Sequence, residues 1–217
     1  MEIIPVLLLR FFVLAVSLSF HEAAHAWTAF RLGDDTAKRL GRISLNPLVH
    51  LDLLGSLMML TGMPLGWAKP VPVNPNRLRN PRAAMPLVSF AGPLSNLLLA
   101  LVGCMVYFLF GYGLGNSGWY LMLRDFILIN FSLAIFNLLP VFPLDGSKIV
   151  TTFMSDRVAD TYEAKVASLG MYPLIAIVIF ESMGSGFGVI DLWFRFWKPL
   201  IYPILALFRV PLQFYPG

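Results

Sequence analysis

Long apolar stretches alternate with shorter polar segments along the chain. Residues 4–31, 83–110 and 119–139 are each apolar over a length that can cross about 30 Å of hydrocarbon as a helix. A shorter apolar run at 169–183 is interpreted as a fourth span. Residues 189–209 are apolar and aromatic but contain charged residues and prolines, and they fit a fifth span and an interfacial helix equally well. The pattern predicts an all-α polytopic membrane protein with about five to six membrane segments.

The helical pattern breaks between the first two long apolar stretches. Residues 51–65 are apolar, but two glycines and a proline leave an uninterrupted part that is too short to span a bilayer. In residues 66–75 proline alternates with other residues, which nearly excludes a helix and favours an extended or edge-strand conformation. We therefore expect a re-entrant or extended element around residues 51–75.

Two further segments are polar enough to lie in water. Residues 33–47 are rich in turn formers and predict a loop, whereas residues 146–168 mix charged and apolar positions and predict a surface helix. No internal repeat or low-complexity tract divides the chain. We expect one membrane-embedded domain over residues 1–217, with a core at about 4–150 and C-terminal helices in 151–217.

Composition supports the membrane interpretation. The chain is 58% hydrophobic and 13% charged, whereas soluble domains are nearer half apolar and a quarter charged. The net charge of +4 would suit nucleic acid in a soluble protein, but here we attribute it to basic cytoplasmic loops and expect no nucleic-acid partner. The single cysteine, Cys104, excludes an intrachain disulfide and is interpreted as a packing residue.

The distribution of basic residues predicts an orientation. Loop 111–118 has no Lys or Arg, whereas segment 31–82 has eight. The positive-inside rule places segment 31–82 in the cytoplasm and the N-terminus outside, in a multi-pass protein of the cell membrane. The eight residues are Arg31, Lys38, Arg39, Arg42, Lys69, Arg77, Arg79 and Arg82.

The end of the first apolar stretch carries the sequence His21-Glu22-Ala-Ala-His25. Two histidines at i and i+4 project from one helix face, so both imidazoles can reach one zinc ion. The adjacent glutamate is then placed to act as general base on water at the metal. Ionisable groups at membrane depth are costly, which favours a functional role over a packing role.

A catalytic zinc needs a third protein ligand and an open position. Asp145 is the best candidate, because it follows the third long stretch at the same predicted level as His25 and lies among prolines that end the helix. Asp52 and Asp125 are weaker candidates. We interpret His50 as a loop-packing or supporting histidine rather than a fourth ligand, which would close the site.

Together these motifs resemble the site-2 protease family of intramembrane zinc metalloproteases, in its compact prokaryotic subgroup without a PDZ domain. The resemblance covers about residues 10–150. It rests on the following motifs: His21-Glu22-x-x-His25, Asn46-Pro47-Leu48-Val49-His50, Gly66-Trp67-Ala68-Lys69-Pro70-Val71-Pro72-Val73-Asn74, Gly92-Pro93-x-x-Asn96 and Asn137-x-x-Pro140-x-x-Pro143-x-Asp145-Gly146.

The resemblance implies an all-α membrane endopeptidase with one Zn²⁺ per chain. It implies that His21, His25 and Asp145 bind the metal and that Glu22 is the general base, in agreement with the residue pattern. Its implied substrates are transmembrane proteins, cut within or near their membrane segments. Substrate identity and oligomeric state are not implied.

Several other polar residues have two interpretations. Asn137 fits a hydrogen-bond donor to the reaction oxyanion and a helix C-terminal cap equally well. Gly92, Pro93 and Asn96 are expected to shape helix packing, with Asn96 bonding across spans, and Arg10 and Lys69 to snorkel. The extended strip is expected to bind substrate through its edge, to plug the site mouth, or both; its candidate substrate-binding residues are Trp67, Pro70, Val71, Val73 and Asn74.

The sequence therefore predicts an intramembrane zinc metalloendopeptidase, with its site toward the cytoplasm. The alternative is a non-cleaving membrane scaffold or pseudo-protease, which would have no need of the base Glu22. A metal transporter is a third possibility, but it would place ionisable residues along the depth of several spans rather than at one level. The expected partners are transmembrane protein substrates and the lipid bilayer.

Overall fold

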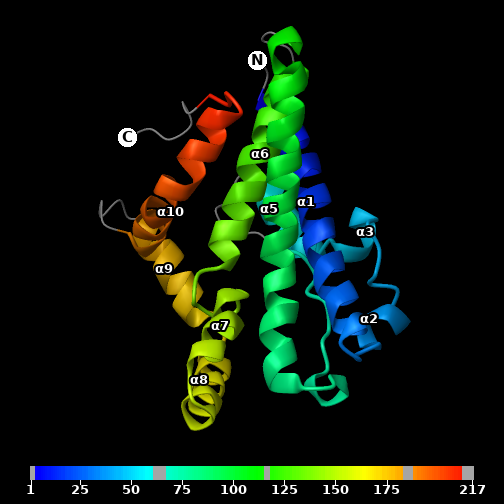
Figure 1. The fold of residues 1–217 in the computed structure, drawn as a ribbon, viewed down its shortest axis with the longest axis vertical. Helices are drawn as coiled ribbons and strands as arrows, with labels where there is room; N and C mark the ends of the chain where they lie inside the picture. Colours follow the sequence, from blue (N-terminus) through cyan, green and yellow to red (C-terminus); the bar gives the residue numbers. More distant parts are fainter. Residues whose placement is uncertain (1–2, 61–66, 115–117, 183–187, 212–217) are drawn as a thin grey trace.

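The computed structural model describes residues 3–60, 67–114, 118–182 and 188–211. Within these ranges the regular elements are helices, and one isolated antiparallel bridge joins Leu51 to Ala68. Three long helices lie side by side along the long axis of the molecule (Figure 1). They are α1 (Ile3–Arg31), α5 (Pro81–Leu114) and α6 (Gly118–Asn137).

These three helices match the three long apolar stretches of the sequence. Each has a segment long and apolar enough to cross a membrane: Pro5–Arg31, Pro81–Gly111 and Gly118–Asn137. Helix α5 contains two internal prolines, Pro86 and Pro93, which long apolar helices tolerate when neighbouring helices satisfy the freed backbone groups. Three of the predicted spans are thereby found as helices of spanning length and apolar composition.

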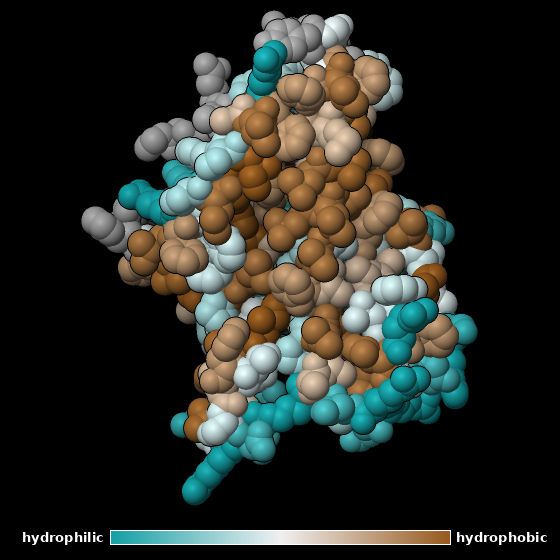
Figure 2. All heavy atoms as spheres, in the orientation of Figure 1, coloured by the Kyte–Doolittle hydropathy of each residue, from teal (hydrophilic) through white to brown (hydrophobic). Residues whose placement is uncertain are grey.

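A hydrophobic surface surrounds the long helices. On α5 the exposed apolar side chains recur at helical spacing, as lipid-facing positions do. Figure 2 shows a broad hydrophobic face over most of the length of the molecule and hydrophilic residues at the end where α2 and α8 lie. This arrangement fits insertion of the helices into a bilayer with one polar end in water. The α5 residues are Leu94, Leu98, Val102, Met105 and Leu109.

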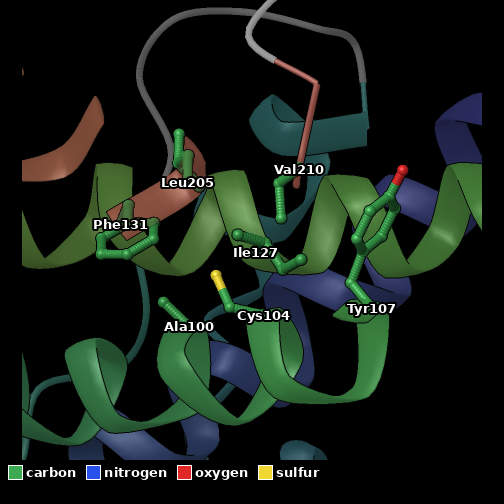
Figure 3. Packing of buried hydrophobic residues seen from close by; sticks show 7 residues of the cluster. All are labelled: Ala100, Cys104, Tyr107, Ile127, Phe131, Leu205 and Val210. Carbon is green, nitrogen blue, oxygen red and sulfur yellow. The ribbon is translucent and has the colours of Figure 1, made fainter. Parts of the chain in front are cut away.

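Helix α5 packs against both α1 and α6. Between α5 and α6, Cys104 and Ile127 are fully buried beside Phe131, and Leu205 and Val210 close the cluster from the C-terminal region (Figure 3). Cys104 is therefore a packing residue, as predicted. The close contact of α1, α5 and α6 is what holds the polar residues of these helices near one another.

The predicted membrane segments after residue 168 are not confirmed as spans. Helix α9 (Tyr172–Ser182) has 11 residues, which at about 1.5 Å per residue is too short for about 30 Å of hydrocarbon. Helix α10 (Val189–Leu207) has 19 residues and a charged pattern that includes Asp191 and Arg195. The total of five to six membrane segments stays a prediction, because three spanning helices are found in the described residues.

The segment between α1 and α5 contains short helices rather than one loop and one inserted element. They are α2 (Thr36–Arg39), α3 (Pro47–His50), α4 (Leu53–Leu60) and η1 (Pro75–Arg77). Residues 67–74 are non-helical, as the alternating prolines predict, and the bridge at Ala68 gives this strip one sheet-like contact. The re-entrant character of 51–65 is not confirmed, and residues 61–66 lie outside the described part.

The prediction of a single surface helix at 146–168 is wrong in detail. This region forms α7 (Gly146–Ile149), η2 (Val150–Phe153) and α8 (Asp156–Leu169). The interruption has a local cause, because Met154 and Ser155 adopt extended backbone and Ser155 starts a new helix with Asp156 in its first turn. Helix α7, which precedes the interruption, packs against α5.

Candidate metal centre

Three side chains from two separate parts of the chain converge near the hydrophilic end of α1. His21 and His25 lie one turn apart on α1, and their Nε2 atoms are 3.0 Å apart. The Oδ2 atom of Asp145 lies 3.1 Å from Nε2 of His21 and 3.3 Å from Nε2 of His25. Both imidazoles are buried. The structure thus brings together the three residues that the sequence nominated as metal ligands.

The spacing of these three atoms fits a tetrahedral metal ion. Zinc binds imidazole nitrogen and carboxylate oxygen at about 2.0–2.2 Å, which sets neighbouring ligand atoms roughly 3.3 Å apart in a tetrahedron. The observed separations of 3.0, 3.1 and 3.3 Å are close to this value. Two imidazoles and one carboxylate are a donor set that suits a catalytic zinc with a position left for water.

The second nitrogen of each imidazole is held by an acceptor on α5. Nδ1 of His25 lies 2.6 Å from the backbone oxygen of Val88, and Nδ1 of His21 lies 2.6 Å from Oδ1 of Asn96. A backbone carbonyl only accepts, so Nδ1 of His25 carries a hydrogen, and the lone pair of the neutral imidazole lies on Nε2. Nδ1 of His21 likewise carries a hydrogen when the Asn96 atom that faces it is the amide oxygen Oδ1.

Main-chain acceptors fix the orientation of Asn96. Its Nδ2 donates to the backbone oxygen of Ser17 at 3.3 Å and to Oδ1 of Asn130 at 2.9 Å, which leaves Oδ1 for His21. Asn130 is fixed in turn, because its Nδ2 donates to the backbone oxygen of Phe126. Ser17, Asn96 and Asn130 are fully buried. This network across α1, α5 and α6 sets the tautomer of His21.

Gly92 lets α5 approach the two imidazoles. A Cβ atom at this position would lie 2.4 Å from Nε2 of His25 and 2.5 Å from Nε2 of His21. Such contacts are far inside van der Waals distance, so any larger residue would move the imidazoles or the helix. Because the close approach is made directly over the two Nε2 atoms, Gly92 has a local role beyond general helix packing.

The turn after α6 carries Asp145 to the histidines. Helix α6 ends at Asn137, and Pro140 and Pro143 follow before α7 begins at Gly146. A Cβ at Gly146 would lie 2.2 Å from the backbone oxygen of Leu138, so the turn closes tightly against the end of α6. This compact turn holds the carboxylate beside α1.

The side chain of Glu22 lines the same cavity as His21, His25 and Asp145. The cavity has a volume of about 140 Å³. The Oε2 atom of Glu22 accepts a hydrogen bond of 3.0 Å from the backbone N–H of Val71 in the extended strip. The lining residues are His21, Glu22, His25, Pro70, Val71, Val73, Met85, Val88, Ser89, Asn137, Pro143, Asp145 and Lys148.

The chain is similar to proteins named as zinc metalloproteases. The family model Peptidase family M50 matches residues 113–180. "Putative zinc metalloprotease YwhC" of Bacillus subtilis is 39% identical over 183 residues, which are 81% of this chain and 81% of that protein. The chain belongs to peptidase family M50. "Zinc metalloprotease MJ0392" of Methanocaldococcus jannaschii is 27% identical over 73% of this chain but 38% of its own length. No solved structure matches significantly.

Membership in family M50 agrees with a zinc-dependent protease in a membrane. The part of the chain that the family model matches includes Asn137 and Asp145 but not α1.

Asn137 lines the cavity, and its Nδ2 also donates to the backbone oxygen of Leu133 at 2.9 Å. An amide nitrogen carries two hydrogens, so one bond to the helix leaves the other available to the cavity. The two interpretations of Asn137 are therefore compatible.

The extended strip, residues 67–74, lines the cavity only in part. Pro70, Val71 and Val73 line the cavity, whereas Trp67 and Asn74 are outside the lining. Asn74 instead donates its N–H to Oδ2 of Asp34 at 2.6 Å. Burial opposes ionisation of Asp34, but hydrogen bonds from Thr36 and from the Asn74 backbone hold the pKa of its carboxyl below the usual value. Asp34 thereby fastens the strip to the end of α1.

The remaining candidates lie away from the three ligands. Nε2 of His50 contacts the backbone oxygen of Ser44 at 2.7 Å, so His50 packs a loop, as predicted. Asp125 contacts Arg124 at 3.5 Å and also accepts a bond of 2.9 Å from Arg10. Arg10 therefore forms an ion pair between α1 and α6, which the snorkelling interpretation did not include.

Sequence reasoning missed several residues of the site. Asn130 and Ser17 had a signal, because polar residues in the middle of an apolar span need a partner. Val88 had no such signal, because the atom that contacts His25 is the backbone oxygen of Val88. Met85 and Lys148 also line the cavity without any motif to mark them.

Proposed function

We propose that this protein is an intramembrane zinc metalloendopeptidase that hydrolyses peptide bonds within or near transmembrane segments. The observation that carries the proposal is the shared cavity of His21, His25, Asp145 and Glu22. It opens among helices long and apolar enough to cross a membrane. At about 1.5 Å per residue, His21 is roughly 27 Å along α1 from its first residue, near the full depth of a hydrocarbon core.

Each residue has a proposed role. His21, His25 and Asp145 hold one zinc ion, which when bound polarises the scissile carbonyl and makes water more acidic. Glu22 takes a proton from the attacking water and returns one to the leaving amine. Asn137 donates its second amide hydrogen to the oxyanion. The strip residues Pro70, Val71 and Val73 form the wall along which an extended substrate lies.

The contact between Glu22 and Val71 bears on how substrate reaches the base. The Val71 N–H occupies one oxygen of the Glu22 carboxylate. An ionised carboxylate has two oxygens with about four acceptor sites, so a hydrogen-bonded Glu22 can still accept a proton from water. The bond orients the carboxylate and ties the strip to the catalytic helix at the same time.

The proposal is tested by cleavage of a model peptide with about 20 apolar residues that include helix-breaking Gly and Asn. Wild type is expected to cut it, and Glu22→Gln is expected to lose at least about 100-fold in rate while keeping its zinc. Equal rates would contradict the proposal. Zinc-loaded wild type that binds but never cuts would support the non-cleaving scaffold instead.

We also propose that the site faces the cytoplasm, on the basis of the basic residues in 31–82. Asn76 is exposed in this region, and the native Cys104 is buried. Asn76→Cys in a Cys104→Ala background is expected to react with a membrane-impermeant maleimide in inside-out vesicles and to stay unlabelled in intact cells. Labelling of intact cells would reverse the orientation.

A further inference from the structure

A second cavity lies beside the catalytic cavity. It has a volume of about 370 Å³ and is enclosed by the start of α5, by α7 and η2, and by α8. Helix α8 lies at the hydrophilic end of the molecule (Figures 1 and 2). None of the motifs discussed above accounts for this cavity.

The two cavities share part of their lining. Met85 and Lys148 line both of them, so they form the boundary between the two spaces. The catalytic cavity, at about 140 Å³, is smaller than the roughly 300–1,000 Å³ of typical ligand pockets. A polypeptide with its scissile bond beside His21 must therefore continue outside the catalytic cavity. The larger cavity is directly next to it.

The wall that α8 contributes is apolar inside and acidic at its rim. Ala159 is buried and Val166 partly buried, whereas Asp160 and Glu163 are exposed. Neither of these two carboxylates makes an ion pair within the described part of the chain.

The basic groups of the same region are paired or lie away from the acidic rim. Arg157 and Lys165 of α8 are absent from the cavity lining. Arg82 does line the cavity, but it is paired with Asp156 at 2.7 Å. Lys148 lies at the inner boundary, toward the catalytic cavity. The exposed rim therefore favours cations.

We propose that this second cavity binds the cytoplasmic flank of the membrane segment that is cut, and that Asp160 and Glu163 select flanks rich in Lys and Arg. The inference rests on the proposed function and names part of its substrate specificity. Cytoplasmic flanks of membrane spans carry an excess of Lys and Arg. The apolar wall takes the aliphatic stems of these side chains while the carboxylates meet their charged ends.

Two model peptides with the same apolar segment test the proposal, one with a Lys-rich and one with a Glu-rich cytoplasmic flank. Wild type is expected to prefer the Lys-rich flank in kcat/KM. Replacing two exposed attractions by repulsions in Asp160→Lys/Glu163→Lys is expected to lower that preference about tenfold. The matched control Arg157→Glu/Lys165→Glu reverses two charges on α8 that do not line the cavity, and its preference is expected to stay within about twofold of wild type.

A second measurement reports binding without catalysis. Val166→Cys is introduced into Glu22→Gln with Cys104→Ala, and the Lys-rich peptide carries one cysteine either in its cytoplasmic or in its opposite flank. With copper phenanthroline as the oxidant, a disulfide is expected with the cytoplasmic-flank cysteine only. Absence of that cross-link, or cross-linking of the opposite flank alone, would overturn the proposal even if the charge variants failed to fold.

The outcomes separate this inference from the proposed function. If wild type and Glu22→Gln cut at equal rates, the protease assignment fails. If wild type cuts and the charge-reversed variant keeps the same preference, only the flank-binding role of Asp160 and Glu163 fails. Loss of the wild-type preference at high salt, where the Debye length falls to about 3 Å at 1 M, would support it.

Discussion

Nδ1 of His21 lies 2.6 Å from Oδ1 of Asn96, inside a network of buried side chains. The sequence suggested a packing role for Asn96, but the structure places its amide against a candidate zinc ligand. Because Asn96 is itself oriented by Ser17 and Asn130, the tautomer of His21 is determined by residues on three helices. The candidate metal site and the packing of the three long helices are therefore physically linked.

Replacing Asn96 by Leu is expected to weaken zinc binding about 10- to 100-fold, because the Nδ1–H of His21 loses its acceptor. Competition with a chromophoric chelator measures the affinity. Ser95→Ala is the matched control, since the Ser95 hydroxyl bonds only to the backbone of its own helix at Gly92. Wild-type zinc affinity in Asn96→Leu would show that the acceptor does not matter.

Gly92→Ala is expected to disturb the metal centre, since the added Cβ would lie 2.4 Å from Nε2 of His25. We expect loss of most bound zinc, with overpacking that costs about 1–3 kcal/mol of stability. Gly113→Ala on the same helix is the control, because its Cβ would meet nothing within 4 Å. Equal zinc content in both variants would contradict the close approach.

Asn137→Ala separates the two roles of that residue. If its second amide hydrogen stabilises the oxyanion, kcat is expected to fall about 10²- to 10³-fold while zinc content is unchanged. A lower unfolding temperature with unchanged kcat would leave only the bond to Leu133 as its role.

Asp34→Asn is expected to destabilise the fold by about 1–3 kcal/mol at neutral pH, because a buried charged acceptor of three hydrogen bonds is lost. The folded-state pKa of Asp34 is lowered, so its contribution is present above about pH 4 and is lost as pH falls through the folded value. Wild type and Asp34→Asn should therefore converge in thermal midpoint at strongly acidic pH.

The neighbouring Asp35 provides the control for this prediction. Its ion pairs with Arg39 and Arg77 lie at the surface, and exposed pairs contribute little. Asp35→Asn is expected to shift the midpoint far less than Asp34→Asn at neutral pH. Equal shifts in the two variants would contradict the clamp between Asp34 and the extended strip.

Local spacing explains what the sequence predicted well. The four-residue interval between His21 and His25 fixes their common direction on any α-helix, and Asp145 follows from its place after an apolar span. Contacts such as Val88 with His25 depend on how two helices rotate against each other and use a backbone atom. No single-residue pattern encodes them, so the supporting network had to come from the structure.

The C-terminal part of the chain shows where hydropathy alone is a poor guide to structure. Hydropathy suggested further spans after residue 168, but the helix at Tyr172–Ser182 has 11 residues and is too short to cross alone. A composition average does not register where a helix starts or stops, and the turn around Gly170, whose φ is 54°, ends α8 just before it. Apolar content therefore predicted the three long apolar helices, whereas the number of crossings after residue 168 depends on where the helices start and stop.

The proposed protease activity depends on one zinc ion held jointly by α1 and the turn after α6. Metal analysis of purified wild type and Asp145→Asn tests this most directly, with Asp52→Asn as the control for a carboxylate outside the cluster. We predict about one zinc per chain in wild type and in Asp52→Asn, and near-complete loss in Asp145→Asn after mild chelation. Full zinc retention in Asp145→Asn, or no zinc in wild type, would contradict the account.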